Sequence, residues 1–199
     1  MRKDDQGAGE MLTVEQGKAL LGLARGVIAR RLGVLADEAG EESEGMLQSE
    51  ALQGRRGTFV TLKKNGELRG CIGSLAASES IVEGVRRNAL NAAFHDSRFH
   101  PLGSDELSEI EIEVSILTEP ARLSHTGPDD LLAQLRVGVD GVILRKGLSS
   151  ATFLPQVWEQ LPDKVEFLDH LCRKAWLPRD AWRREGLEVY VYQVQHFEE

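Results

Sequence analysis

Hydrophobic and polar residues alternate most regularly between residues 109 and 117. Isoleucine or valine occupies every even position from 110 to 116, and glutamate or serine occupies every odd position from 109 to 115. This period of two predicts a strand with one apolar and one carboxylate-rich face. Side chains two residues apart on a strand lie about 7 Å apart. No histidine or second acidic strand is evident beside them, so we expect an exposed strand face rather than an acid–base or metal site.

A β-hairpin is predicted upstream of this strand. Residues 58–62 are β-branched and aromatic, and the strand they form is followed by Asn65-Gly66, a strong signal for a tight hairpin turn. The returning strand covers residues 68–72. It contains one of the two cysteines of the chain, Cys71.

Two capping boxes predict the starts of helices. Thr13 with Gln16 opens a helix with an apolar stripe, and Ser80 with Glu83 opens a second helix that ends near Phe94. Between the first helix and the hairpin, the acidic stretch 33–54 predicts a mobile surface loop with at most a short helix near 47–52.

The second half of the chain continues to mix the two kinds of element. We expect a helix over 128–135, strands over 138–146 and 151–154, a helix after Asp163 and a final strand over 188–194. Helices mixed with hairpin-connected strands indicate an α+β fold rather than a parallel doubly wound sheet. Residues 1–11 are polar and are expected to be disordered.

Composition narrows the classes of function. The 199 residues carry 24 Lys and Arg against 32 Asp and Glu, a formal charge of −8, which disfavours binding to a nucleic-acid backbone. We interpret the pairs Arg86-Arg87 and Arg183-Arg184 as solvated helix faces. No apolar run has the length of a membrane span, and the first ten residues do not resemble a secretion signal. A cytoplasmic location without membrane association is therefore expected.

Cys71 is the strongest candidate for chemistry. It lies in the segment Leu68-Arg69-Gly70-Cys71-Ile72-Gly73, where Gly70 and Gly73 permit close approach of another group and Arg69 favours the thiolate if alternation places both side chains on one face. The alternative is that Cys71 is a small buried hydrophobe in a glycine-rich strand. Cys172 lies on an apolar helical stripe and is predicted to be a core residue.

A second polar cluster follows the helix that Ser80 opens. Asp96 and Arg98 either support the cysteine or tie down the helix exit through an ion pair, and His95 is a candidate base for Cys71. His196 carries no signal of a partner. No phosphate-binding loop, dinucleotide fingerprint or set of metal ligands at a characteristic spacing is present, so no cofactor and no metal are expected.

With these residues laid out, the chain resembles the AMMECR domain family, whose bacterial and archaeal members are called AmmeMemoRadiSam system protein A. The resemblance rests on segments spread from about residue 13 to 197. They are Leu68 to Gly73, Ala92 to Phe99, Ile112 to Leu117, Gly141 to Leu144, Ala151 to Trp158 and Phe167 to Lys174. Two departures are visible: Ser97 replaces the usual proline, and Trp176 replaces the glycine that commonly follows Lys174-Ala175.

The resemblance implies one domain over residues 12–197, built as two closely packed, intertwined subdomains on mainly antiparallel sheets flanked by helices. It also implies Memo-like and radical-SAM proteins as partners, but no established reaction. The suggestion of an enzymatic role in the family rests on its Arg-Gly-Cys motif.

Two main hypotheses follow, beside a weaker third, nucleic-acid binding, which the charge of −8 disfavours. In the first, a cleft centred on Cys71 and Arg69 binds or modifies a small molecule, with Gly70, Gly73, Asp96 and Arg98 in support and Thr152 and Gln156 lining the opposite wall. In the second, the chain is a non-catalytic protein-interaction module in which the Arg-Gly-Cys motif is structural.

Overall fold

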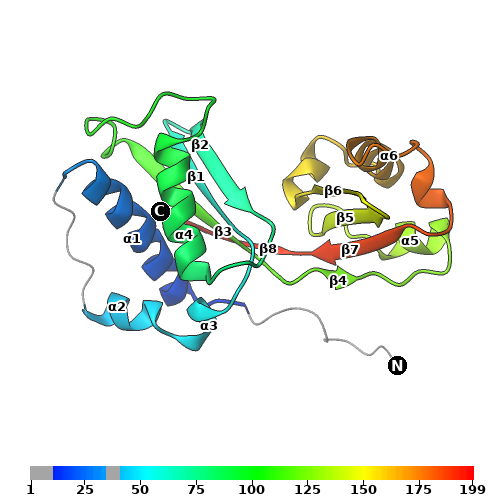
Figure 1. Ribbon diagram of the computed structural model, residues 1–199, viewed down its shortest axis with the longest axis horizontal. Helices are drawn as coiled ribbons and strands as arrows, with labels where there is room; N and C mark the ends of the chain where they lie inside the picture. The colour runs from blue at the N-terminus through cyan, green and yellow to red at the C-terminus, as the bar shows by residue number, and fades with distance from the viewer. Residues whose placement is uncertain (1–10, 35–40) are drawn as a thin grey trace. The chain divides into compact units, whose positions relative to one another are not determined.

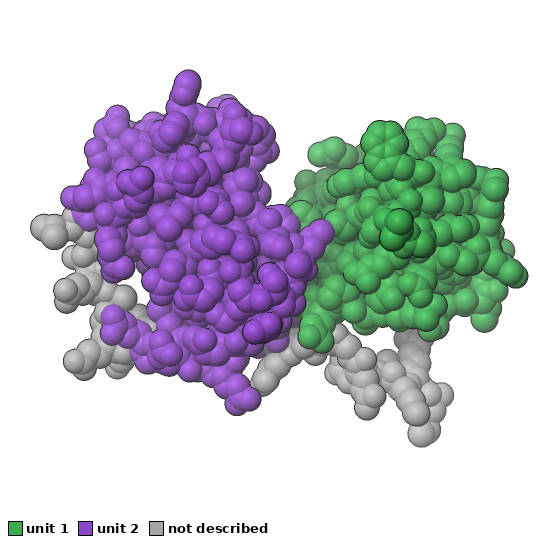
Figure 2. Space-filling model, viewed as in Figure 1, with its two compact units in different colours: residues 1–8, 118–194 green, residues 9–117, 195–199 purple. Residues whose placement is uncertain are grey.

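The structure is a computed structural model that describes residues 11–34 and 41–199, and it consists of two compact units. Of the described residues, unit 1 contains 118–194, and unit 2 contains those from 11 to 117 together with 195–199 (Figure 2). The predicted disorder of residues 1–11 lies almost wholly outside the described residues. Within those residues, no helix is long and apolar enough to cross a membrane.

Unit 2 is a sheet with helices on one of its faces. In the described part of the chain the sheet has four strands in the order β2-β1-β3-β8. Their bounds are β1 Thr58–Lys64, β2 Glu67–Ser74, β3 Ile110–Leu117 and β8 Val194–Glu198. The helices α1 (Val14–Arg31) and α4 (Ile81–Phe94) pack against it and bury the apolar side of β1 and β3 (Figure 1). The opposite side carries most of the polar residues of the same strands, among them Thr61, Lys63 and Glu113.

Unit 1 has its own sheet and its own core. Among the described residues this sheet has the order β4-β7-β5-β6, and its paired strands are antiparallel. Its elements are β4 Ala121–Arg122, α5 Pro128–Gln134, β5 Gly141–Lys146, β6 Ser149–Phe153, η1 Pro155–Glu159, α6 Lys164–Lys174, η2 Ala181–Arg183 and β7 Glu188–Tyr192. Trp158 stacks on Phe167 in the core, with ring centroids 3.6 Å apart. The predicted α+β class is confirmed.

Most of the predicted elements are present. The capping box at Thr13 opens α1, and Ser80 caps α4, which ends at Phe94 as predicted. The hairpin turns at Asn65 and Gly66, where φ is 54° and 77°, the left-handed values that a tight two-residue turn requires.

Two predictions for the chain path are wrong. The described part of the acidic stretch 33–54 contains two helices rather than one, α2 (Glu41–Leu47) and α3 (Glu50–Gln53), because Leu47 and Leu52 enter the core; residues 35–40 of the predicted loop lie outside the described residues. The final strand breaks at Gln193 into β7 and β8, which belong to different sheets. Periodicity cannot detect this break because the apolar pattern runs through it.

The end of α6 shows how the chain accommodates the missing glycine. Trp176 adopts φ 58° and is 94% exposed, while the Trp176 and Leu177 amides bond to the carbonyls of Arg173 and Cys172. This is the Schellman pattern that glycine usually completes, and Gly33 completes it at the end of α1 with φ 71°. A tryptophan in this conformation is strained, since its Cβ crowds the backbone.

Trp176→Gly should therefore stabilise the protein. The left-handed conformation costs a non-glycine residue about 1–2 kcal/mol, and the greater freedom of glycine in the unfolded chain offsets part of the gain, leaving about 0.5–1 kcal/mol. Urea denaturation measures the difference. Trp176→Ala is the control, because alanine removes the exposed indole and keeps the strain; an equal gain from both variants would contradict this explanation.

Candidate functional site

The two glycines of the Cys71 segment are required by packing. β2 is an edge strand that lies directly against α4, and a Cβ on Gly70 would stand 2.3 Å from the carbonyl oxygen of Ala92. A Cβ on Gly73 would stand 2.2 Å from the ring of Phe59 on β1. Both distances are shorter than any real carbon contact, so these glycines allow the helix and a neighbouring side chain to close on the strand.

A β-bulge separates Arg69 from the regular part of β2. Leu62 faces Gly70 and Lys63 faces Leu68, so Arg69 is the extra residue of the bulge. Strict alternation of side chains from Arg69 to Cys71, the condition for both to share one face, is therefore wrong. The Arg69 side chain pairs with Glu106 through two hydrogen bonds of 3.0 and 2.8 Å. This paired guanidinium lowers the pKa of Glu106 to about 2. The charged partner of Arg69 is thus a carboxylate in the loop before β3.

Asp96 and Arg98 hold the backbone of Cys71 from its outer side. The Cys71 amide donates to the Asp96 carboxylate at 2.9 Å, and Arg98 Nη2 donates to the Cys71 carbonyl at 3.2 Å. Arg98 also binds Asp96 through Nε and Nη2, at 2.9 and 2.6 Å. The hydrogen bonds from the guanidinium and from the backbone amides of Cys71 and Arg98 hold the pKa of the Asp96 carboxyl well below its usual range. They outweigh the burial of this side chain, which is only 4% exposed and whose desolvation would raise that pKa. We call this arrangement the Asp96–Arg98 clamp.

Cys71 itself is half-buried. The sulfur lies 3.3 Å from the hydroxyl of Thr61, the residue directly opposite on β1. Cys172, in contrast, is fully buried in the core of unit 1, where desolvation raises its thiol pKa. His95 is exposed at the end of α4, and among the described residues no interaction joins it to Cys71.

A polar cluster that the sequence did not reveal lies on the same side of the sheet. Glu113 on β3 stands opposite Thr61 and accepts hydrogen bonds from Lys63 Nζ at 2.9 Å and His196 Nδ1 at 3.2 Å. Ser115 Oγ lies 3.0 Å from the same His196 nitrogen. The hydrogen bond from His196 lowers the pKa of Glu113 most, and the bond from Lys63 lowers it further. Together they bring this pKa to about 2, although burial of the carboxyl acts in the opposite direction.

The expected exposed carboxylate face is therefore wrong at this position. Glu113 is 17% exposed and engaged, whereas Glu111 on the same side is exposed. A row of polar side chains thus crosses three strands, from Cys71 through Thr61 to Glu113. His196 comes from the far end of the chain, and no local pattern connects it with β3.

The remaining predicted site residues, Thr152 and Gln156, belong to unit 1. Thr152 lies on β6, where its hydroxyl bonds to the Val142 carbonyl and lies 3.0 Å from the Tyr192 hydroxyl. Gln156 lies on η1. Their predicted role as a wall of the Cys71 site stays a prediction.

Comparison with known proteins places this fold in a family. The model of the AMMECR1 family matches residues 21–197, which include both segments joined by the clamp. The chain belongs to the AMMECR1 family. It is 42% identical over 195 residues to the protein MK0488 of Methanopyrus kandleri, with 96% of this chain and 92% of that protein covered.

Other AMMECR1-like relatives are of similar length. Protein MJ0810 of Methanocaldococcus jannaschii is 37% identical, with 95% of this chain and 92% of that protein covered. The crystal structure of an uncharacterised protein, PH0010 from Pyrococcus horikoshii, superimposes with a TM-score of 0.75 at 34% identity. It covers 94% of this chain and 93% of that one. The family resemblance in the sequence is therefore confirmed.

Gly70→Ala should destabilise the protein because the added methyl group meets the α4 backbone rather than a movable side chain. We expect a loss of about 1–3 kcal/mol in the free energy of unfolding. Gly22→Ala is the matched control, since a Cβ at Gly22 meets nothing within 4 Å and alanine favours the α1 helix by up to about 1 kcal/mol. Equal effects of the two changes in urea denaturation would refute the packing role of Gly70.

Glu113→Gln tests the hydrogen-bonded Glu113 cluster against its exposed neighbour, Glu111. At pH 7 we expect a loss of about 1–3 kcal/mol for Glu113→Gln and less than about 0.5 kcal/mol for Glu111→Gln. The folded pKa of Glu113 lies below its unfolded value of 4.5, so its contribution is complete above pH 4.5 and is lost as the pH falls toward 2. Denaturation of wild type and variant should therefore converge at low pH; a constant difference would contradict the assignment.

Proposed function

We propose that the chain binds a small molecule at a site centred on Cys71 and presents the thiol to it. The observation that carries this proposal is the contrast between the backbone and the side chain of one residue. The Asp96–Arg98 clamp fixes the amide and the carbonyl of Cys71, while the residue itself is only half-buried and its sulfur lies 3.3 Å from the Thr61 hydroxyl. A reactive or ligating group performs best when its position is fixed before the ligand arrives.

The groups around the thiol extend the proposed site. Arg98 places a positive charge at the Cys71 carbonyl, and the polar row continues through Thr61 to the paired carboxylate of Glu113. Thiol, hydroxyl and carboxylate on successive strands give a bound molecule several polar contacts. Memo-like and radical-SAM proteins are the proposed partners of this activity, and a cytoplasmic location is proposed with them, both through the family resemblance.

A second candidate function has its own support. Gly70 and Gly73 are fully explained by packing, and the Asp96–Arg98 clamp occupies the outer edge of β2 at Cys71. Edge strands in proteins are protected against unwanted pairing by such devices. In this alternative, the Arg-Gly-Cys motif builds the strand, and the chain acts as a protein-interaction module without chemistry at Cys71.

Alkylation of the native protein by iodoacetamide separates the two candidates. We expect Cys71 to be alkylated in the folded Cys172→Ala chain, because the residue is only half-buried, and the fully buried Cys172 to resist alkylation in the folded Cys71→Ser chain. Mass spectrometry of the intact protein measures both.

How readily Cys71 is alkylated, compared with Cys172, decides between the two candidate functions. Alkylation of Cys71 that requires as much denaturant as alkylation of Cys172 would show that Cys71 is a packing residue, and the interaction module would then replace the proposed function. Thr61→Val is a further variant, because it keeps the shape of the threonine and removes the hydroxyl beside the sulfur. We expect Thr61→Val to change the rate at which Cys71 is alkylated. Any shift of the denaturation midpoint should be no larger than the changed burial of residue 61 accounts for.

A further inference from the structure

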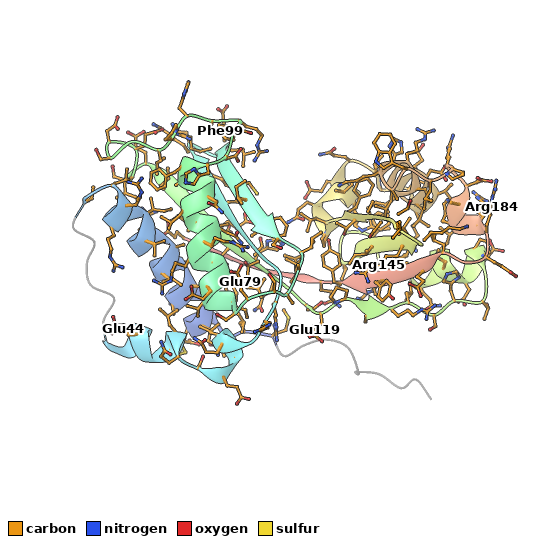
Figure 3. The ribbon with its side chains drawn as sticks, viewed as in Figure 1. Glu44, Glu79, Phe99, Glu119, Arg145 and Arg184 are labelled. Carbon is orange, nitrogen blue, oxygen red and sulfur yellow. The ribbon has the colours of Figure 1, made fainter. Side chains whose placement is uncertain are left out.

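A hollow of about 540 Å³ lies at the outer edge of β2 in unit 2. It is lined by Arg69, Glu106 and the run 97–101, which follows α4. Phe99, one of the residues of this run, is labelled in Figure 3. Arg98 links the hollow to the Cys71 segment, because it lines the hollow and also donates to the Cys71 carbonyl.

The acceptors around the hollow are already satisfied. Both oxygens of Glu106 receive hydrogen bonds, from the Arg69 guanidinium and from the Gly103 amide. Both oxygens of Asp96 receive hydrogen bonds from Arg98, and one of them also accepts the Cys71 amide. A ligand in the hollow therefore meets one lining carboxylate, Glu106, whose oxygens are already hydrogen-bonded, while Asp96 pairs with Arg98 without lining the hollow itself.

The donors, by contrast, are not all used. Arg69 Nη1 is buried and has no hydrogen-bond partner in the described part of the chain. Arg98 is 53% exposed, and its hydrogen bonds among the described residues go through its main-chain amide, Nε and Nη2, which leaves Nη1 for a ligand. Leaving a buried donor without an acceptor is costly, so a bound acceptor would be stabilising here.

The apolar part of the lining also fits a ligand. The ring of Phe99 lies 5.4 Å from the Arg98 guanidinium carbon and 5.9 Å from that of Arg69. Two guanidinium groups around one ring combine positive charge with a flat apolar surface. This combination suits a small organic anion better than a neutral molecule.

We infer that the hollow binds the carboxylate or phosphate group of a small molecule, with Arg98 Nη1 as its main donor and Arg69 behind it. This inference deepens the proposed function and rests on it, since the anion would anchor the molecule that meets Cys71. Arginine favours such groups because its planar fork matches their oxygens.

Titration of the full chain with inorganic phosphate and with acetate at constant ionic strength tests this inference. The Cys71→Ser chain is used, so that the result does not depend on the thiol, and two-dimensional NMR follows the amides of residues 97–101. We expect saturable shifts with at least one anion. Saturation by phosphate alone would assign a phosphate-bearing ligand, and saturation by acetate alone would assign a carboxylate. No saturation with either anion would overturn the inference.

Arginine variants then locate the binding. Arg98→Lys keeps the positive charge next to Asp96 but removes the planar guanidinium group with its paired N–H donors. We therefore expect roughly tenfold weaker anion binding. Arg87→Lys is the control, because Arg87 pairs with Glu79 and does not line the hollow. Unchanged affinity in Arg98→Lys, in a chain whose denaturation midpoint is retained, would overturn the assignment.

The two proposals fail separately. Anion binding in the Cys71→Ser chain, with no alkylation of native Cys71, would keep the anion site and remove the thiol from the function. Alkylation of Cys71 without anion binding would keep the thiol and remove the hollow. Saturating anion that slows alkylation of Cys71 several-fold would connect the two.

Discussion

The candidate site depends on one buried carboxylate. Asp96 receives the amide of Cys71, the amide of Arg98 and two nitrogens of the Arg98 guanidinium, and its side chain is 4% exposed. Its negative charge is stabilised by these donors, and removal of any one of them would leave a buried group partly unsatisfied. This carboxylate joins β2 to the loop after α4, two segments that lie 25 residues apart at their point of contact.

Packing around the carboxylate explains why the surrounding residues are small. α4 approaches β2 so closely that its Ala92 carbonyl occupies the space of a Cβ at Gly70. The approach brings Asp96, just beyond the end of α4, to the outer edge of the strand at Cys71. Helix packing, the glycine and the clamp are therefore parts of one arrangement, and the half-buried Cys71 and the hollow with its unused arginine donors lie at its margin.

Much of this fold was predictable from local patterns. The capping residues Thr13 and Ser80, the Asn65-Gly66 turn and the alternation in β3 each encode an element through short-range chemistry. The candidate site was predictable in part: residue type and family resemblance named Cys71, Asp96 and Arg98 as candidates, and the structure brings these three together. Their exact contacts, such as the amide of Cys71 on Asp96, depend on tertiary packing that no local pattern records.

Three features could not be predicted, each for a physical reason. The bulge at Arg69 shifts the register by one residue without a change in hydrophobic pattern, so the arginine pairs with Glu106 instead. The Glu113–His196 contact joins strands 83 residues apart. Finally, a Schellman ending formed on Trp176 despite the lack of glycine, because the packing of α6 outweighs a strain of about 1–2 kcal/mol.

Hydrogen exchange at the Cys71 amide tests the central claim most directly. Cys71 and Gly73 both direct their amides to the outer edge of β2, since residues two apart on an antiparallel strand share an edge. Only the Cys71 amide is bonded to the Asp96 carboxylate among the described contacts of this edge. After correction for intrinsic rates, the Cys71 amide should exchange far more slowly than that of Gly73. Equal protection of the two amides would show that Asp96 does not hold the strand, and would contradict this account of the site.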